Sequence, residues 1–441
     1  MTANEKNMNV LVTGATGFLG FNIAKGLMLA GHSVVACARN PEEWRAKLPM
    51  FTWQAVDFTR DTTAAVWLPR LDNVDIVINA VGIISELGEQ TFQRIQTEAP
   101  CALFAAANEL NLKVIQISAI GADQSSQMPP FLETKKQADA FLQTLPVESV
   151  IAYPSIVMGR AGTSTALFQK IAALPIIPLI GNGEQTVNPV HINDVVAAIV
   201  HIVSHWEAGK RIYYLTGSDI YSLRDLYTEQ RDWLRLPPAR FLKVPRLMVN
   251  GLLGTAEKVG LTRLFPNVVS KDTLDMLDSV GTPAPNYSPV MPRRLKETFW
   301  LEPATLSDTW GARLRVWQPL MLLALAFIWI FTGLTSAFFD LESGYELLAA
   351  GGITGMFATL GIYTGALLDF ALGIAMLVRF RYRQVLWFQI VLMCSYMVLI
   401  GFIVPEQWLH PFGPVTKNFP MLAGTLLLIW MEPARTYLKR I

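Results

Sequence analysis

The chain has 441 residues, of which 52% are hydrophobic and only 16% are charged, well below the roughly 25% charged residues of an average soluble protein. Lysine plus arginine (36) and aspartate plus glutamate (35) nearly cancel, so the charge balance gives no argument for nucleic acid as a partner. The histidines and cysteines show no metal-site spacing. A chain of this length exceeds one ordinary domain, and we expect two or three.

The first predicted unit is a strand, a glycine-rich turn and a helix. Residues 9–13 (NVLVT) are a short apolar run, GATGFLG follows, and an apolar-periodic segment then continues to Gly31. Gly14 would permit a tight turn, Gly17 a close approach of backbone to pyrophosphate, and Gly20 close packing of the helix on the strand. The phosphates would lie at the helix N-terminus, where free N–H groups favour anions. The pattern predicts a dinucleotide site.

A second predicted strand, HSVVACARN, ends at Arg39. An NAD-selective site would hold an acid here for the ribose 2′-hydroxyl, whereas an arginine suits a 2′-phosphate. NADP is therefore favoured over NAD, the alternative being an arginine that is simply solvated at a strand end. Apolar strands at 75–83 and 113–122 alternate with helical stretches. This alternation predicts an α/β fold with a doubly wound parallel Rossmann-type sheet.

The motifs TGATGFLG, NAVG, ISAIGAD, YPSIVMG and NPVHINDVV occur in this order. The set resembles the extended or atypical short-chain dehydrogenase/reductases, especially the branch that holds the nucleotide-binding accessory subunit of respiratory complex I and the NmrA-like proteins. The resemblance covers about residues 8–300. It implies a pyrophosphate cradle of Thr13, Gly14, Ala15, Thr16, Gly17, Phe18, Leu19 and Gly20, adenine contacts from Asp57 and Phe58, a path to the nicotinamide along Ala80, Val81 and Gly82, an active-site Ser118 and Lys135, and a nicotinamide-side loop that begins at Pro154.

The family's catalytic tyrosine is missing. In PFLETKKQAD, Lys135 stands in the lysine place of a Tyr-x-x-x-Lys pair, but the tyrosine place holds Phe131. Phenylalanine has no ionisable hydrogen and cannot act as a general acid. Lys135 would still serve in ribose binding, and the alternatives are a solvated Lys135 and a Ser118 that merely caps a strand end. A hydride could still pass to an acceptor that takes its proton elsewhere, as quinones do, or the domain binds nucleotide without turnover.

Residues 154–300 are expected to form the substrate side, with nucleotide binding at about 8–153. A helix is predicted from Asn193 or Asp194, and another from Ser222. The proline-rich segment after Leu236 suggests a lid or a connector. We expect 301–316 to be a linker.

The rest of the chain, 317–441, contains long runs of apolar residues. We expect four membrane-spanning helices near Trp317–Phe339, Met356–Val378, Val385–Val404 and Phe419–Trp430, with Ala434 as the alternative end of the last one. Arginines and lysines precede the first run, separate the second from the third and close the chain, whereas the other two connections carry most of the acids. The positive-inside rule then places both termini in the cytoplasm. We expect a multi-pass protein of a bacterial-type inner membrane.

The segments AAGGITG, LLDFALG and WLHPFGPVTKNFP resemble the DoxX-like membrane family, which includes a quinone-linked oxidoreductase subunit. Asp369 lies inside the second predicted span, where an unpaired carboxylate costs at least about 2.5 kcal/mol. It is either a functional acid or one that fixes helix packing.

These features together predict a membrane-anchored NAD(P)H-binding oxidoreductase that acts on a lipophilic acceptor, quinone or lipid. The rival prediction is a non-catalytic nucleotide-binding module that regulates or assembles a membrane protein partner, as the phenylalanine at 131 suggests. A weaker alternative is an epimerase or dehydratase, against which the missing tyrosine counts.

Overall fold

The computed structural model describes residues 7–124, 128–258, 286–411 and 413–432. These residues form two compact units. The second holds the C-terminal helices from Arg313 onward and, among the described residues, also includes 256–258. Each unit is described by itself.

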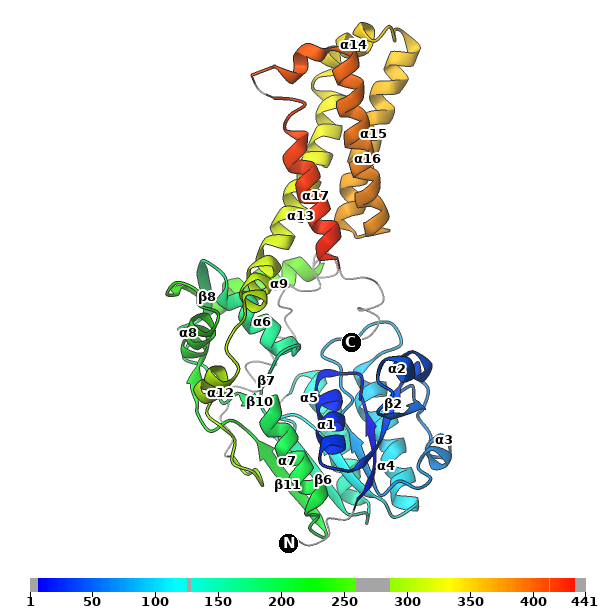
Figure 1. The fold of residues 1–441 in the computed structure, drawn as a ribbon, viewed down its shortest axis with the longest axis vertical. Coiled ribbons are helices and arrows are strands. Elements are labelled where there is room, and N and C mark those ends of the chain that lie inside the picture. The colour runs from blue at the N-terminus through cyan, green and yellow to red at the C-terminus, as the bar shows by residue number, and fades with distance from the viewer. Residues whose placement is uncertain (1–6, 125–127, 259–285, 412, 433–441) are drawn as a thin grey trace. The chain divides into compact units, whose positions relative to one another are not determined.

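The first unit is built on a seven-stranded parallel sheet with strand order β11-β6-β5-β4-β1-β2-β3 (Figure 1). The strands are β1 Asn9–Thr13, β2 Ser33–Ala38, β3 Thr52–Ala55, β4 Ile76–Asn79, β5 Lys113–Ile117, β6 Ser149–Pro154 and β11 Lys210–Leu215. The order reverses direction between β1 and β4, where doubly wound sheets bind their ligands beyond the carboxyl ends of the strands. The predicted α/β fold is confirmed.

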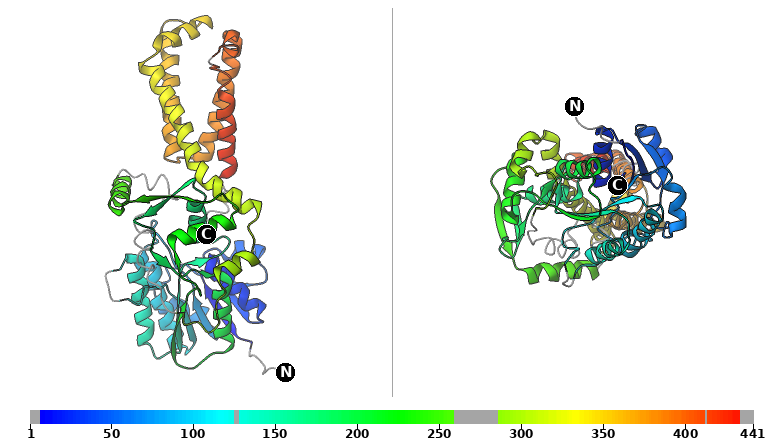
Figure 2. Two further views of the ribbon diagram at one scale, coloured as in Figure 1. Left: turned by 90° about the vertical axis from the view of Figure 1, so that its left-hand side faces the viewer. Right: turned by 90° about the horizontal axis from the view of Figure 1, so that it is seen from below.

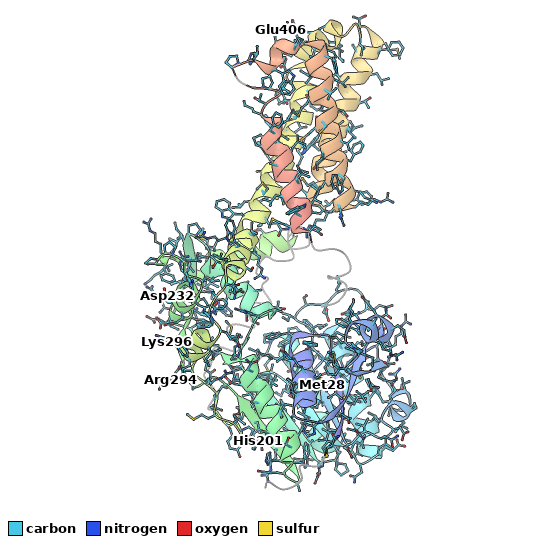
Figure 3. The ribbon with its side chains drawn as sticks, in the orientation of Figure 1. Met28, His201, Asp232, Arg294, Lys296 and Glu406 are labelled. Atoms are coloured by element: carbon cyan, nitrogen blue, oxygen red, sulfur yellow. The ribbon has the colours of Figure 1, made fainter. Side chains whose placement is uncertain are left out.

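Helices cover both faces of this sheet. Val10 and Val12 of β1 face a core that includes α1 and α7, while Leu11 between them faces the core on the other side; this alternation is the period-two pattern of a strand buried on both faces. Met28 of α1, labelled in Figure 3, packs on the first core. The helices are α1 Phe18–Leu29, α2 Pro41–Lys47, α3 Ala64–Trp67, η1 Leu68–Arg70, the π-helix η2 Arg94–Glu98, α4 Ala99–Glu109, α5 Pro130–Thr144 and α7 Ile192–Ser204.

The substrate-side part, mostly green in Figure 2, adds short strand pairs and helices, and a third core lies among several of them. The pairs are β7 Val157–Met158 with β10 Val190–His191, β9 Thr186–Val187 with β12 Tyr221–Ser222, and β8 Ile176–Ile180 with β13 Arg240–Val244. The helices are α6 Thr163–Ala172, α8 Leu223–Trp233, α9 Arg246–Lys258 and α12 Leu295–Leu301. Both predicted helix starts hold, since His191 caps α7 and Ser222 caps α8 through side-chain hydrogen bonds.

The second unit is helical and packs around its own apolar core. Its elements are α13 Leu306–Phe338, α14 Leu341–Ala350, α15 Met356–Leu377, α16 Tyr382–Ile403, η3 Pro405–Trp408 and α17 Asn418–Met431, with α13 beginning in the first unit. Three of these helices, α13, α15 and α16, are long and apolar enough to cross a membrane.

The fourth predicted span coincides with α17, whose 14 residues extend about 21 Å, short of a hydrocarbon core of about 30 Å. The possible extension to Ala434 and the basic C-terminal residues lie outside the described residues. The first acidic connection is not a plain loop, because α14 occupies it; Asp340 caps this helix by accepting a hydrogen bond from the Ser343 N–H.

Candidate active site

The glycine turn after β1 is closely packed at two positions. Gly14 has φ +67°, and a Cβ there would lie 2.8 Å from the backbone oxygen of Ala80. A Cβ on Gly20 would lie 2.2 Å from the backbone oxygen of Gly14. Helix α1 therefore starts directly over the turn. Its N-cap is Gly17, and no side chain of the described residues caps it, which leaves the first amides for an anion.

Arg39 and Asp57 lie at the carboxyl ends of the neighbouring strands. Arg39 directly follows β2 and is exposed. The Asp57 carboxylate accepts hydrogen bonds from the amide (3.0 Å) and hydroxyl (2.8 Å) of Thr59, so its position is fixed. Phe58 is buried with its ring edge-on to Trp67, 5.6 Å between centroids. Any contact of Phe58 with an adenine would therefore come from its backbone.

Lys135 comes from α5 and is 5% exposed. Its Nζ donates to the backbone oxygen of Ile117 at 3.2 Å, and it lies 3.5 Å from the place where a Cβ of Gly82 would be. Lys135 is thus not a solvated helix lysine, and it stands beside the predicted nicotinamide path. Burial lowers its pKa to about 8, an effect that the charge of Asp139 opposes.

Phe131 occupies the missing tyrosine's place on the same helix. Its ring packs edge-on against Phe92 at 6.2 Å and lies 5.9 Å from the Lys135 ammonium. The site therefore keeps the lysine and fills the tyrosine position with an apolar ring.

The sequence analysis missed Asp139, one helical turn beyond Lys135. Ser118, the first residue after β5, donates its hydroxyl hydrogen to Asp139 Oδ2 at 2.5 Å, and both side chains are buried. Burial raises the pKa of Asp139 to about 6, against the Ser118 hydrogen bond and the positive charge of Lys135. The i, i+4 spacing from Lys135 was the available signal, because it puts both residues on one helix face.

Hydrogen-bonded, buried polar side chains lie between this cluster and the glycine turn. Thr13 donates its hydroxyl to Asn79 Oδ1 at 2.7 Å, and Asn79 donates its amide to Gln116 Oε1 at 2.7 Å. The three residues are register neighbours on β1, β4 and β5. Pro154 at the end of β6 accepts a hydrogen bond from the Ile120 amide at 3.1 Å. The predicted residues on β1, β4, β5 and β6 thus meet at one edge of the sheet.

Tyr153, the tyrosine nearest in sequence, is buried on β6 with its ring stacked on Tyr214 at 5.4 Å. Burial raises its pKa far above the ordinary value, and the charges of Asp139 and Asp123 add to this. Tyr153 therefore stays un-ionised at neutral pH.

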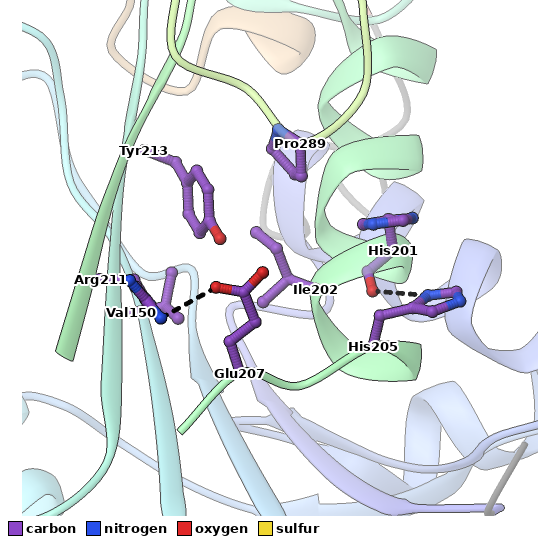
Figure 4. Close-up of a pocket in the computed structure, with 8 residues that line it drawn as sticks. All are labelled: Val150, His201, Ile202, His205, Glu207, Arg211, Tyr213 and Pro289. Atoms are coloured by element: carbon purple, nitrogen blue, oxygen red, sulfur yellow. Dashed lines mark hydrogen bonds and ion pairs between the residues drawn. The ribbon is translucent and has the colours of Figure 1, made fainter. Parts of the chain in front are cut away.

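A small pocket lies at the opposite end of the sheet, where β6 and β11 begin (Figure 4). His201 of α7 stacks there on His205, the residue that follows the helix, with 4.4 Å between ring centroids, and Arg211 pairs with Glu207 at 3.0 Å. The described residues hold no cluster of three or more His, Cys, Asp or Glu side chains that could bind a metal ion. This pocket shares no residue with the predicted nucleotide edge.

In the second unit, Asp369 lies on the inner side of α15, 7% exposed. Its Oδ1 has no hydrogen-bond partner in the described part of the chain. The Tyr396 hydroxyl of α16 lies one turn away, 3.8 Å from where a Cβ of Gly365 would be. Gln389, also on α16, is fully buried. The predicted acid therefore faces other helices.

Two family models match separate parts of the chain. Residues 10–215 match the NAD dependent epimerase/dehydratase family, and residues 326–426 match the DoxX-like family. The first part is therefore an epimerase- or short-chain dehydrogenase-like NAD-binding Rossmann domain, and the C-terminal part contains a DoxX-like domain. With its apolar helices, this domain indicates membrane association.

The relatives of the Rossmann part include differently named proteins from different organisms. The chain is 28% identical over 289 residues to NADH dehydrogenase (ubiquinone) 1 alpha subcomplex subunit 9, mitochondrial, of Arabidopsis thaliana, covering 60% of this chain and 68% of the relative. It is 25% identical over 202 residues to ceramide reductase of Caulobacter vibrioides, covering 43% of this chain and 59% of that protein. A crystal structure of UDP-glucuronic acid 4-epimerase from Bacillus cereus in complex with NAD is 21% identical, covers 54% of this chain and 87% of its own, and has a TM-score of 0.44. The predicted likeness to a complex I accessory subunit is confirmed.

Proposed function

We propose that this protein is a membrane-anchored NAD(P)H-dependent oxidoreductase that acts on a lipophilic acceptor, a quinone or a lipid. The observation that carries the proposal is the buried Ser118–Asp139–Lys135 cluster, at the same sheet edge as an uncapped glycine turn. A chain that binds dinucleotide only to stabilise its fold has no need of a buried acid and lysine there, because burying ionisable groups is costly.

The residues at the sheet edge fit a dinucleotide. Gly20 leaves no room for a side chain between the turn and α1, and Gly14 leaves none beside Ala80. The turn therefore packs directly against the start of α1, where the free amides would face a pyrophosphate. Lys135 beside Gly82 would hold the nicotinamide ribose. Bound NAD(P)H would supply a hydride. Exposed Arg39 at the end of β2 supports a preference for NADP, since its guanidinium matches a 2′-phosphate.

Two facts support a lipophilic acceptor. The chain carries a DoxX-like domain with three helices that could cross a membrane, which would keep the Rossmann domain at a membrane surface. One relative is named a ceramide reductase, and ceramide is a lipid. A bacterial-type inner membrane with both termini in the cytoplasm is part of this proposal, since NADPH is found on that side.

A non-catalytic nucleotide-binding module is the second candidate, and Phe131 is the observation that favours it. Such a module would regulate or assemble a membrane protein partner, and one relative is named as a subunit of a larger dehydrogenase. An epimerase is the weakest candidate, because the tyrosine that the family uses is missing.

The test uses the detergent-purified full-length protein. NADPH fluorescence is followed on mixing with protein, then after addition of decylubiquinone or of methyl undecyl ketone. Enhancement followed by acceptor-dependent decay is the expected result. If the NADPH fluorescence rises and then does not decay after either acceptor is added, the result would favour the nucleotide-binding module. If neither NADPH nor NADH fluorescence rises on mixing with the protein, both candidates would be refuted.

A further inference from the structure

We propose that Asp139 and Ser118 together take over the proton-donating work of the missing tyrosine, with Asp139 as the proton source and Ser118 as the group that reaches the acceptor oxygen. This inference rests on the proposed oxidoreductase function and goes beyond it by naming the acceptor class: a carbonyl, whose reduction needs a proton as well as a hydride.

The geometry supports a relay through Ser118. Asp139 is 3% exposed and lies behind Ser118, 2.5 Å from its hydroxyl, so it would not itself touch an acceptor. When Asp139 is a carboxylate, the Ser118 hydroxyl donates to it. When Asp139 is protonated, the carboxyl can donate to the Ser118 oxygen, which frees the hydroxyl hydrogen for an acceptor.

Ser118 and Asp139 together can supply the one proton that reduction of a carbonyl to an alcohol needs besides the hydride. The hydride arrives at the carbonyl carbon, and the carbonyl electron pair moves to the oxygen. That oxygen takes the Ser118 hydroxyl proton, while the Ser118 oxygen takes the proton of the Asp139 carboxyl. An alcohol is formed, Ser118 is again neutral, and Asp139 is left as a carboxylate close to the Lys135 ammonium.

The surroundings of Asp139 suit an acid that works near neutral pH. Besides Ser118, the groups that face it are Lys135 on its own helix, Gln116 on β5, Tyr153 on β6 and Cys101 on α4. Burial holds the pKa of Asp139 at about 6, and burial also raises the pKa of the Cys101 thiol to about 11. Asp139 is therefore the group in this cluster that gains and loses a proton just below neutral pH, and general acids work best when their pKa lies near the working pH.

The unpartnered second oxygen of Asp139 is the independent observation. Oδ1 is buried and makes no hydrogen bond of good geometry within the described residues, although the Gln116 and Tyr153 side chains face this carboxyl and lower its pKa as weak donors. A carboxylate held only for structure would normally have both oxygens satisfied, because an unpaired buried acceptor is costly. A protonated carboxyl with its hydrogen on Oδ2 leaves a carbonyl-type Oδ1, which is less costly to leave unpaired.

The experiment compares Asp139→Asn, Ser118→Ala, Phe131→Tyr and the double variant Phe131→Tyr/Asp139→Asn in the detergent-purified full chain. Glu133→Gln is the matched control, since it removes an exposed carboxylate from the same helix. NADPH oxidation is measured with methyl undecyl ketone, which needs the proton in the reducing step, and with decylubiquinone, which can take electrons first.

We expect Asp139→Asn and Ser118→Ala to lower ketone reduction by about 100-fold, within the range for general acid–base catalysis, and to lower quinone reduction less, because a quinone can take electrons before it takes a proton. Phe131→Tyr should restore ketone reduction to the Asp139→Asn protein. Wild-type ketone reduction should fall as pH rises above about 6, because the protonated carboxyl is lost, and the rescued double variant should lose this dependence.

A readout without turnover accompanies these rates. Infrared titration of the wild type and Glu133→Gln should show a protonated carboxyl that disappears near pH 6 and is missing from Asp139→Asn. Equal loss of ketone and quinone reduction, failure of the tyrosine to rescue, or no Asp139-dependent carboxyl signal would overturn the inference. If wild type reduces only the quinone, the proposed function stands and the relay is refuted; if no variant reduces either acceptor, both fall.

Discussion

Arg39 stands where an NAD-selective site of this class would hold an acid, and the proposed preference for NADP rests on this single position. We expect Arg39→Ala to weaken NADPH binding by about tenfold while NADH binding stays within about twofold, because only NADPH presents a 2′-phosphate to the guanidinium. Fluorescence titration of both nucleotides measures this. Arg45→Ala is the control, since Arg45 is an exposed neighbour paired with Glu42 on α2. Equal loss of both nucleotides would refute the assignment.

For single residues, the sequence predicted which side chains belong to the site better than it predicted their burial and hydrogen bonds. Ser118 and Lys135 follow from motif order, but neither motif says that Lys135 would be buried or that Ser118 would donate to Asp139. That contact joins the end of β5 to the second turn past Phe131 on α5. It depends on how the helix packs on the sheet, which local pattern does not specify.

At the scale of elements, the main strands and the long helices could be read from the chain. Strand β1 matches the predicted 9–13, and α15 Met356–Leu377 is one residue short of the predicted second span. Two-residue strands such as β9 and β12 were not predictable, because they are defined by pairing between distant segments. Helix α14 was missed because its acids looked like a solvated connection.

The contact between α13 and α15 gives a prediction of its own. A Cβ on Gly373 would lie 2.6 Å from Ile330 Cγ1 and 3.0 Å from the Ala326 backbone oxygen, so a larger residue must push the helices apart. Small residues at such crossings let helix backbones approach closely. We expect Gly373→Leu to destabilise the protein by about 1–3 kcal/mol or more, the usual cost of overpacking.

Thermal unfolding in detergent measures this change. Gly361→Leu on the same helix is the matched control, because a Cβ on Gly361 would approach, within the described residues, just the flexible end of Leu348 at 3.5 Å. If the two variants unfold at the same temperature, α13 and α15 do not cross at Gly373.

At the scale of the whole molecule, the cofactor of the Rossmann domain and the charges beside the apolar helices both bear on which side of the membrane the Rossmann domain lies. A Rossmann domain that uses NADPH needs the compartment that supplies it, and the arginines next to the apolar helices give an independent indication of side. Arg379 and Arg381 lie between α15 and α16 and Arg383 lies in the first turn of α16, whereas Glu342 and Glu346 lie on α14, which precedes α15. The positive-inside rule predicts that the turn formed by these three arginines, the arginine turn, lies in the cytoplasm and that α14 lies on the far side.

Single cysteines test this orientation. In a Cys394→Ser background, which removes the exposed cysteine, Glu346→Cys should react with a membrane-impermeant maleimide in intact bacterial cells. Gln384→Cys, which leaves the three arginines in place, should react only after the cells are permeabilised. The background protein without an added cysteine gives the blank, since Cys101 is partly exposed. Labelling of Gln384→Cys in intact cells would put the arginine turn outside. The Rossmann domain is separated from this turn by two spans, α13 and α15, so it would lie on the same side and apart from NADPH.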